Sequence, residues 1–87
     1  MRLDCKDDKE KFMITEKAVQ YFTNNYDCIT IDGVRIKFEN GWGLVRSSNT
    51  QPVIVCRFEA TTQNNLNQMK ELVLTKLREF GEIKYDE

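Results

Sequence analysis

Hydrophobic residues near the start of the chain recur with the spacing of a helix. Four of them fall largely on one helical face: Phe12, Ala18, Val19 and Phe22. Asp7 stands before this stretch and Glu10 follows three residues later, an arrangement typical of the capping box that begins a helix. The pattern ends at Asn24 and Asn25. The sequence therefore predicts a first helix over residues 9–23.

The middle of the chain alternates apolar and polar residues with a period of two, which is typical of half-buried strands. The alternation predicts strands over residues 29–32, 34–38, 42–45 and 53–59. Turn signals separate the first three, at Asp32-Gly33 and at Asn40-Gly41. We expect the inner face of the sheet to be lined by Ile29, Ile31, Val34, Ile36, Phe38, Ile54, Cys56 and Phe58.

A second helix is indicated by apolar residues that step by 3, 4, 4 and 3 positions, namely Leu66, Met69, Val73, Leu77 and Phe80. Gly81 follows them as a stop signal. Two helices can cover the apolar face of one sheet only if both lie on it. We therefore predict an α+β fold of order α-β-β-β-β-α, with a four-stranded, mainly antiparallel sheet and both helices on one face. Residues 1–87 are expected to form a single domain, with its core at about residues 9–81.

Composition excludes several classes of function. The 87 residues include no histidine, which rules out an imidazole base, a Ser-His-Asp triad or a histidine zinc site within this chain. Thirteen basic against fourteen acidic residues give a net charge of −1, whereas a nucleic-acid-binding protein normally has a basic excess. No apolar run approaches the roughly 20 residues of a membrane helix. We expect a cytoplasmic protein without a membrane or nucleic-acid partner.

Neither the three cysteines nor the acidic residues near the N-terminus predict a metal site. Cys5, Cys28 and Cys56 are odd in number and widely spaced, so we expect free thiols, with Cys56 buried as a small hydrophobic residue. The acidic side chains Asp4, Asp7 and Asp8 are interpreted as a helix start favoured by the helix dipole. No metal ligand is assigned within this chain.

The segment that most suggests chemistry is residues 46–52, between two strands. It is longer than the usual hairpin loop of about 2–5 residues, and it holds one arginine, two serines, an asparagine, a threonine and a glutamine but no acid. A guanidinium offers a planar fork to two phosphate oxygens, and hydroxyl and amide groups satisfy the others. The same residues also fit an ordinary polar loop whose side chains bond to their own backbone.

Three stretches of the sequence resemble one known family. They are Asp-Gly-Val-Arg-Ile at residues 32–36, Gly-Trp-Gly-Leu-Val-Arg-Ser-Ser-Asn-Thr-Gln-Pro at 41–52, and Arg-Phe-Glu-Ala at 57–60. Together they resemble the C-terminal, fourth domain of the α-D-phosphohexomutases and are most similar to the bacterial phosphomannomutase/phosphoglucomutase branch. Ser47 replaces the usual Pro or Ala, and Gln51 stands where many members have Glu. The family's fold at this domain is similar to that of the TATA-binding protein, which agrees with the predicted architecture.

The resemblance implies a function for the loop. Arg46, Ser48, Asn49 and Thr50 align with the residues that hold the substrate phosphate while this domain closes the active site. The implied partners are a hexose phosphate (glucose or mannose 1- or 6-phosphate), its bisphosphate intermediate, and the other domains of the enzyme. Those domains would carry the phosphoserine and Mg²⁺, so this fragment alone is expected to have no catalytic residue and no activity.

A second function remains open at this point, because a sheet with two helices behind it is also a platform for nucleic acid or protein binding. RNA-binding sheets expose aromatic residues, so the face on which Phe58 lies separates the two hypotheses. Trp42 is interpreted as a packing residue at the sheet edge rather than a sugar platform, and Arg57 as a solvated or domain-facing residue. The preferred hexose, the oligomeric state and the docking of the domain do not follow from the sequence.

Overall fold

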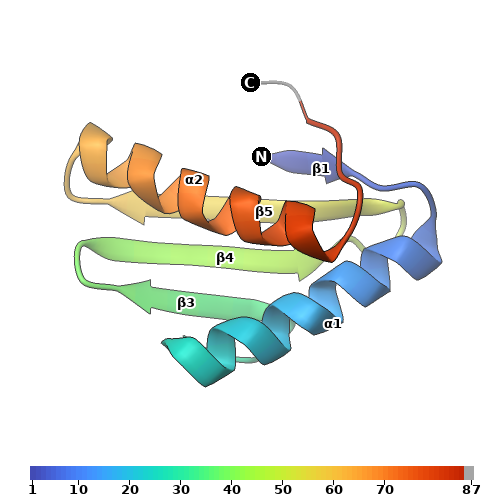
Figure 1. Ribbon diagram of the computed structural model, residues 1–87, viewed down its shortest axis with the longest axis horizontal. Helices are drawn as coiled ribbons and strands as arrows, with labels where there is room; N and C mark the ends of the chain where they lie inside the picture. The colour runs from blue at the N-terminus through green and yellow to red at the C-terminus, as the bar shows by residue number, and fades with distance from the viewer. Residues whose placement is uncertain (86–87) are drawn as a thin grey trace.

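The computed structural model describes residues 1–85 as one antiparallel sheet with two helices packed on the same face (Figure 1). The sheet has five strands in the order β1-β5-β4-β3-β2. The elements, in chain order, are β1 (Arg2–Asp4), α1 (Asp8–Asn25), β2 (Asp27–Ile29), β3 (Val34–Phe38), β4 (Gly41–Ser47), β5 (Val53–Ala60) and α2 (Gln63–Phe80). The predicted α+β fold and the placement of both helices are confirmed. The predicted number of four strands is wrong by one.

The additional strand is β1, which pairs with β5 at the edge of the sheet. Its middle residue, Leu3, is fully buried opposite Ile54. On its other side, Asp4 exchanges two backbone hydrogen bonds with Lys84, of 2.7 and 3.0 Å. Asp4 is therefore a strand residue rather than part of a helix start. The sequence alone suggests a C-terminal tail over residues 84–87, but Lys84 belongs to this bridge. Residues 86–87 of that segment lie outside the described part.

The core lies between the sheet and the helices. Four of the eight side chains predicted for the inner face are fully buried there: Val34, Ile36, Ile54 and Cys56. Phe38 and Phe58 are half-buried and pack against them. Ile29 and Ile31 were predicted wrongly, because the inward residue of β2 is Cys28, opposite Ile36. Ile29 then faces the other side of the sheet, and Ile31 lies in the loop after β2 with 83% of its surface exposed.

Helix α1 begins where the sequence predicts. The carboxylate of Asp7 accepts a hydrogen bond of 2.8 Å from the amide of Glu10, which caps the helix. Its buried side, however, is Lys11, Ile14, Ala18 and Phe22. Phe12 was wrongly placed in the buried stripe and is 56% exposed, because it stands one residue, about 100° of helical turn, away from Lys11.

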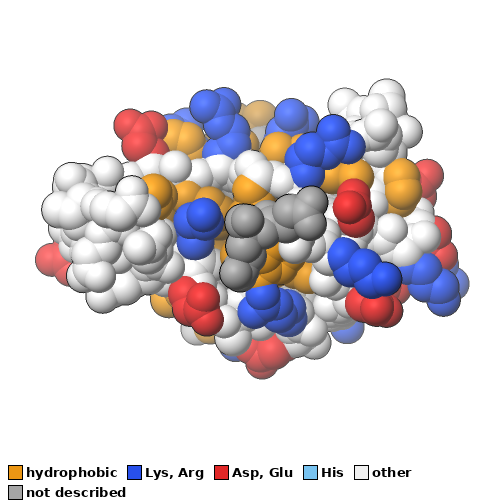
Figure 2. Space-filling view, turned by 90° about the horizontal axis from the view of Figure 1, so that it is seen from above, with side chains coloured by type: hydrophobic (Ala, Val, Ile, Leu, Met, Phe, Trp, Pro, Cys, Tyr) orange, Lys and Arg blue, Asp and Glu red, His pale blue; other side chains and the backbone are white. Residues whose placement is uncertain are grey.

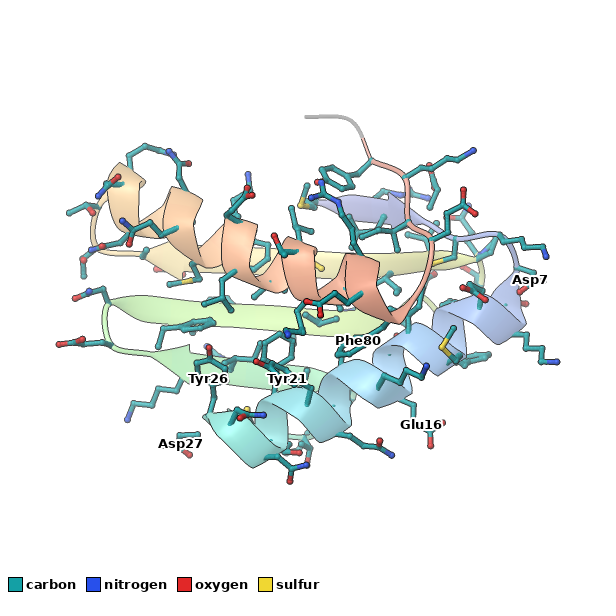
Figure 3. The ribbon with its side chains drawn as sticks, viewed as in Figure 1. Asp7, Glu16, Tyr21, Tyr26, Asp27 and Phe80 are labelled. Carbon is teal, nitrogen blue, oxygen red and sulfur yellow. The ribbon has the colours of Figure 1, made fainter. Side chains whose placement is uncertain are left out.

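Helix α2 follows its predicted stripe closely, with Met69, Val73, Leu74 and Leu77 buried. It ends at Gly81, whose amide donates to the carbonyl of Leu77 at 3.2 Å. The two helices meet near this end, where the rings of Tyr21 and Phe80 point toward one another with centroids 6.1 Å apart (Figure 3). Within residues 1–85, neither helix combines the length and the hydropathy that crossing a bilayer requires.

Candidate functional site

The loop predicted over residues 46–52 is shorter in the structure, because β4 continues through Arg46 and Ser47. Residues 48–52 join the neighbouring strands β4 and β5 at the end of the sheet where α1 begins (Figure 1). Its base is closed by a hydrogen bond of 2.9 Å from the amide of Ser48 to the carbonyl of Val53. The amide of Val53 in turn donates to the carbonyl of Gln51 at 2.8 Å. From the β1 side, the amide of Cys5 donates to the carbonyl of Pro52 at 2.8 Å. The backbone of the loop is thus anchored on both flanks.

Arg46 lies on the face of the sheet that the helices leave uncovered. Its neighbour Val45 is fully buried on the helix side, and strand alternation turns Arg46 the other way, opposite Val55. The Arg46 side chain is 38% exposed, and its Nη1 atom lies 3.7 Å from Oδ2 of Asp32. The guanidinium therefore stands next to the loop with one exposed carboxylate as its neighbour.

The Asp32-Gly33 turn packs directly on the end of β4. Asp32 has φ 56° and Gly33 has φ 94°, the left-handed region that favours glycine. A Cβ atom on Gly33 would lie 2.3 Å from the carbonyl oxygen of Val45 and 2.8 Å from Cβ of Arg46. The turn signal read from the sequence therefore has a role beyond reversing the chain, because it lets Asp32 approach the guanidinium.

The remaining predicted residues lie together in the loop. Ser48 is half-buried, and its hydroxyl accepts a hydrogen bond of 3.3 Å from the amide of Thr50. Asn49 and Thr50 are exposed. Within residues 1–85, the amide of Asn49 and the side chains of Asn49 and Thr50 form no hydrogen bond. The loop thus has one local bond of the kind an ordinary polar loop forms, and it leaves several donors available to a ligand.

Sequence reasoning missed Lys11, which reaches the loop from α1. Its side chain is 2% exposed, and Nζ donates to the carbonyl oxygens of Ser48 at 2.7 Å and Gln51 at 3.0 Å. Oδ1 of Asp8 lies 3.2 Å from the same nitrogen. The only sequence signal for a buried Lys11 is its place in the helical spacing 11, 14, 18, 22 of the buried residues of α1. A search for apolar residues omits Lys11 because it is charged.

Two further side-chain contacts lie beside the loop. The hydroxyls of Thr15 and Ser47 lie 2.7 Å apart and connect α1 to the last residue of β4. The guanidinium of Arg2 donates to the side-chain carbonyl of Gln51. Gln51, one of the two departures from the family pattern, therefore connects the loop to β1.

The uncovered face of the sheet carries Trp42, Arg35 and Lys37 on adjacent strands. The guanidinium carbon of Arg35 lies 4.3 Å from the centre of the Trp42 ring, a cation–π contact. A pocket of about 470 Å³ opens beside them, lined also by Asp27. Trp42 was expected at the sheet edge, but β4 is the middle strand of five. Arg57 is exposed on the same face, opposite Leu44.

Phe58 separates the two functional hypotheses. A Cβ atom on Gly43 would lie 3.1 Å from the Phe58 ring and 3.5 Å from that of Phe38, so both rings flank a buried glycine on the helix side. They are therefore not displayed to a nucleic acid. In the view onto the β1 edge, basic and acidic side chains are interspersed (Figure 2). The position of Phe58 favours the sugar-phosphate hypothesis over RNA binding.

The three thiols are free, and burial raises the pKa of Cys56 to about 12. Burial also raises the pKa values of Cys5 and Cys28. Within residues 1–85, no three His, Cys, Asp or Glu side chains are grouped closely enough to hold a metal ion.

Comparison with known families bears on the whole chain. The family model described as "Phosphoglucomutase/phosphomannomutase, C-terminal domain" matches residues 1–76. The chain belongs to this family. Among similar proteins of the phosphoglucomutase/phosphomannomutase family, the phosphomannomutase/phosphoglucomutase of Pseudomonas putida is 56% identical over 48 residues, which are 55% of this chain and 10% of that protein. The enzyme of the same name from Pseudomonas aeruginosa is 51% identical over 49 residues, 56% of this chain and 11% of its own.

More distant relatives cover more of the chain. The phosphoglucosamine mutase of Methanocaldococcus jannaschii is 32% identical over 84 residues, which are 90% of this chain and 18% of that protein. A crystal structure of a phosphoglucomutase/phosphomannomutase family protein from Burkholderia thailandensis matches with a TM-score of 0.71 and 28% identity, over 98% of this chain and 19% of that one. The resemblance read from the sequence is confirmed. The chain spans between about a tenth and a fifth of the length of these relatives.

Proposed function

We propose that residues 1–87 act as one domain of a longer phosphohexomutase and that residues 46–52, the end of β4 and the loop 48–52 after it, bind the phosphate group of a hexose phosphate. The observation that carries the proposal is that Arg46 and the exposed donors of Asn49 and Thr50 lie together in this one anchored segment. Membership of the phosphoglucomutase/phosphomannomutase family supports the choice of a sugar phosphate as the ligand.

The donors of the loop suit a phosphate dianion. The guanidinium of Arg46 can bond two phosphate oxygens at once through its planar fork. The amide of Asn49 and the side chains of Asn49 and Thr50 can bond the third oxygen without giving up a partner within residues 1–85. Ser48 can use its hydroxyl as a donor while it still accepts from the amide of Thr50.

This role determines what the loop must recognise. In the proposed reaction, a phosphoserine elsewhere in the enzyme transfers its phosphoryl group to the sugar, and the bisphosphate then turns round before it returns the other group. The loop therefore holds a phosphate at either end of the sugar and should recognise the dianion alone. The domain closes the active site by holding that phosphate. Catalytic groups and Mg²⁺ are assigned to other domains, and the 87-residue chain alone should not isomerise hexose phosphates.

The test is a titration of the ¹⁵N-labelled 87-residue chain with inorganic phosphate, followed by amide chemical shifts. We expect shifts centred on residues 46–50 and a dissociation constant on the order of millimolar or weaker, because an open loop gains little from excluding water. Arg46→Ala should abolish the shifts. Arg57→Ala is the matched control, since it removes an exposed arginine from the same sheet face. Equal losses in both variants would contradict a specific phosphate loop.

A further inference from the structure

We propose that Lys11 is a positioning residue for the phosphate loop: by holding the carbonyl of Ser48, it directs the amide of Asn49 outward toward the ligand. This inference rests on the phosphate-binding function proposed above and extends it to a residue on helix α1, outside the loop motif. The experiment below separates a failure of this inference from a failure of that function.

The contacts of Lys11 are those of an anchor rather than of a ligand-binding group. The side chain is 2% exposed, so its ammonium group cannot reach a phosphate in solvent. All three N–H donors of the ammonium have a partner nearby: the carbonyls of Ser48 and Gln51 and the carboxylate of Asp8. Two of these three partners are backbone atoms of the loop itself. A cation that is buried and fully bonded in this way fixes the atoms around it.

The direction of the Asn49 amide follows from the geometry of the peptide unit. The bond between Ser48 and Asn49 is trans, as is every peptide bond in the described chain. In a planar trans peptide the C=O and N–H bonds point in opposite directions. Because the Ser48 carbonyl points into the protein at Lys11, the N–H of Asn49 must point away from it. That N–H has no hydrogen-bond partner within residues 1–85.

The second carbonyl held by Lys11 acts differently. The peptide unit after Gln51 joins it to Pro52, which has no N–H to direct. This bond, of 3.0 Å, therefore only fastens the far side of the loop. Lys11 thus holds the loop at two points three residues apart, and the outward donors of Asn49 and Thr50 lie between them.

The ion pair with Asp8 supports the same arrangement. Asp8 is exposed and stands in the first turn of α1, three residues before Lys11. The carboxylate lies 3.2 Å from the ammonium, so the buried cation does not depend on the loop carbonyls alone for its stabilisation. A surface-exposed partner of this kind contributes little by itself, which leaves the two carbonyls as the contacts that define the role of Lys11.

The first measurement uses the phosphate-free chain. In Lys11→Met, whose unbranched side chain is one atom shorter and cannot donate, we expect the ¹⁵N order parameter of the Asn49 amide to fall below that in the wild type. Thr15→Val is the matched control, because the Thr15 hydroxyl also reaches β4 from α1 but bonds the Ser47 hydroxyl and the backbone carbonyl of Lys11, and no carbonyl of the loop 48–52. It should leave the Asn49 amide unchanged.

The second measurement is the phosphate affinity of the folded variants. We expect binding to weaken about three- to tenfold in Lys11→Met, because the loop must then be ordered by the ligand. Lys11→Arg, which keeps a buried cation and its donors, should recover part of the loss. If Lys11→Met does not fold, Lys11→Gln replaces it. The glutamine side chain is neutral and shorter, so its amide should hold at most one of the two carbonyls. We then expect a smaller loss of phosphate affinity and of order at the Asn49 amide.

The outcomes separate the two claims. An Asn49 amide that keeps its order and a phosphate affinity within experimental error of the wild type, in a folded Lys11→Met or Lys11→Gln, would overturn the positioning role. So would an equal effect from Thr15→Val. If the wild type shows no phosphate shifts while Lys11→Met still disorders the Asn49 amide, the phosphate function fails and the positioning of the amide stands.

Discussion

Oδ2 of Asp32 lies 3.7 Å from Nη1 of Arg46, so the guanidinium assigned to phosphate already has a carboxylate beside it. The two residues come from different parts of the sheet, the turn before β3 and the end of β4. A phosphate dianion must compete with this exposed carboxylate, or bind on the open side of the guanidinium against its repulsion. In both cases we expect Asp32 to weaken the proposed binding of phosphate to the loop.

Asp32→Asn should therefore tighten phosphate binding. Asparagine tolerates the left-handed φ of 56° at this position, so the turn should persist. An exposed ion pair is worth about 0–1 kcal/mol, which corresponds to a gain in affinity of up to about fivefold. The measurement is the phosphate titration by amide shifts. Asp27→Asn is the control, because Asp27 lies opposite Lys37 in the β2–β3 ladder, away from Arg46. Unchanged or weaker binding in Asp32→Asn would contradict the competition.

Gly33→Ala should lower both stability and phosphate binding. The new Cβ would meet the carbonyl oxygen of Val45 at 2.3 Å in a backbone conformation that alanine disfavours. We expect a loss of about 1–3 kcal/mol in the free energy of unfolding, measured by urea denaturation. Because the same Cβ also approaches Arg46, the phosphate shifts should weaken in the folded protein. A loss below about 0.5 kcal/mol would show that the turn is not packed on β4 as described.

Leu77→Ala should cost about 2–5 kcal/mol of the free energy of unfolding, because a large side chain is removed from the fully buried stripe of α2. Leu72→Ala is the matched control on the same helix, since Leu72 is 40% exposed. It should cost markedly less. Similar losses in both variants, measured by denaturant unfolding, would mean that the face of α2 that packs on the sheet has been misplaced.

The stability of the protein should fall at high pH because of Cys56. Its thiol ionises near pH 9 in the unfolded chain, whereas burial raises the pKa to about 12 in the fold. Below pH 9 both states keep the proton and nothing changes. Between about pH 9 and 12 the unfolded state loses its proton first, so stability declines by at most about 1.4 kcal/mol per pH unit.

Cys56→Val isolates this contribution, because valine fills a similar space and does not titrate. Both proteins are unfolded in denaturant at pH 8 and at pH 10.5. The free energy of unfolding of the wild type should fall more than that of the variant over this interval. The other two cysteines remain in both proteins, so their ionisation cancels in the comparison. If the free energies of unfolding of the wild type and of Cys56→Val fell equally between pH 8 and pH 10.5, the burial of the Cys56 thiol would be contradicted.

The sequence predicts correctly those helices and strands whose buried residues are all apolar and regularly spaced. Helix α2 is read correctly because its buried stripe is entirely apolar, and β3 and β5 because their inward residues alternate without a break. Strand β1 is missed since it is three residues long and too short to show a period. In β2 the alternation was assigned one residue out of register, because Cys28 was not counted among the inward hydrophobic residues and Ile29 was.

Some residues of the candidate site could be predicted from the sequence and others could not. Arg46, Ser48, Asn49 and Thr50 lie within five consecutive residues, so a local motif is enough to select them. Lys11 and Asp32 act at a distance along the chain. Lys11 bonds carbonyls 37 and 40 residues away, and a carbonyl is present at every residue, so no side-chain pattern in the loop reveals the pairing. These two contacts required the tertiary structure.

The central claim is that the loop recognises a phosphate dianion and not the sugar. The most direct measurement compares three titrations of the ¹⁵N-labelled 87-residue chain, with glucose 1-phosphate, mannose 6-phosphate and inorganic phosphate. The account predicts that all three ligands shift the same amides, those of residues 46–50, with similar affinity. Arg46→Ala should abolish the shifts, and Arg46→Lys should weaken them because the bidentate fork is lost. A strong preference for one sugar, or shifts centred on Trp42 that survive Arg46→Ala, would contradict the account.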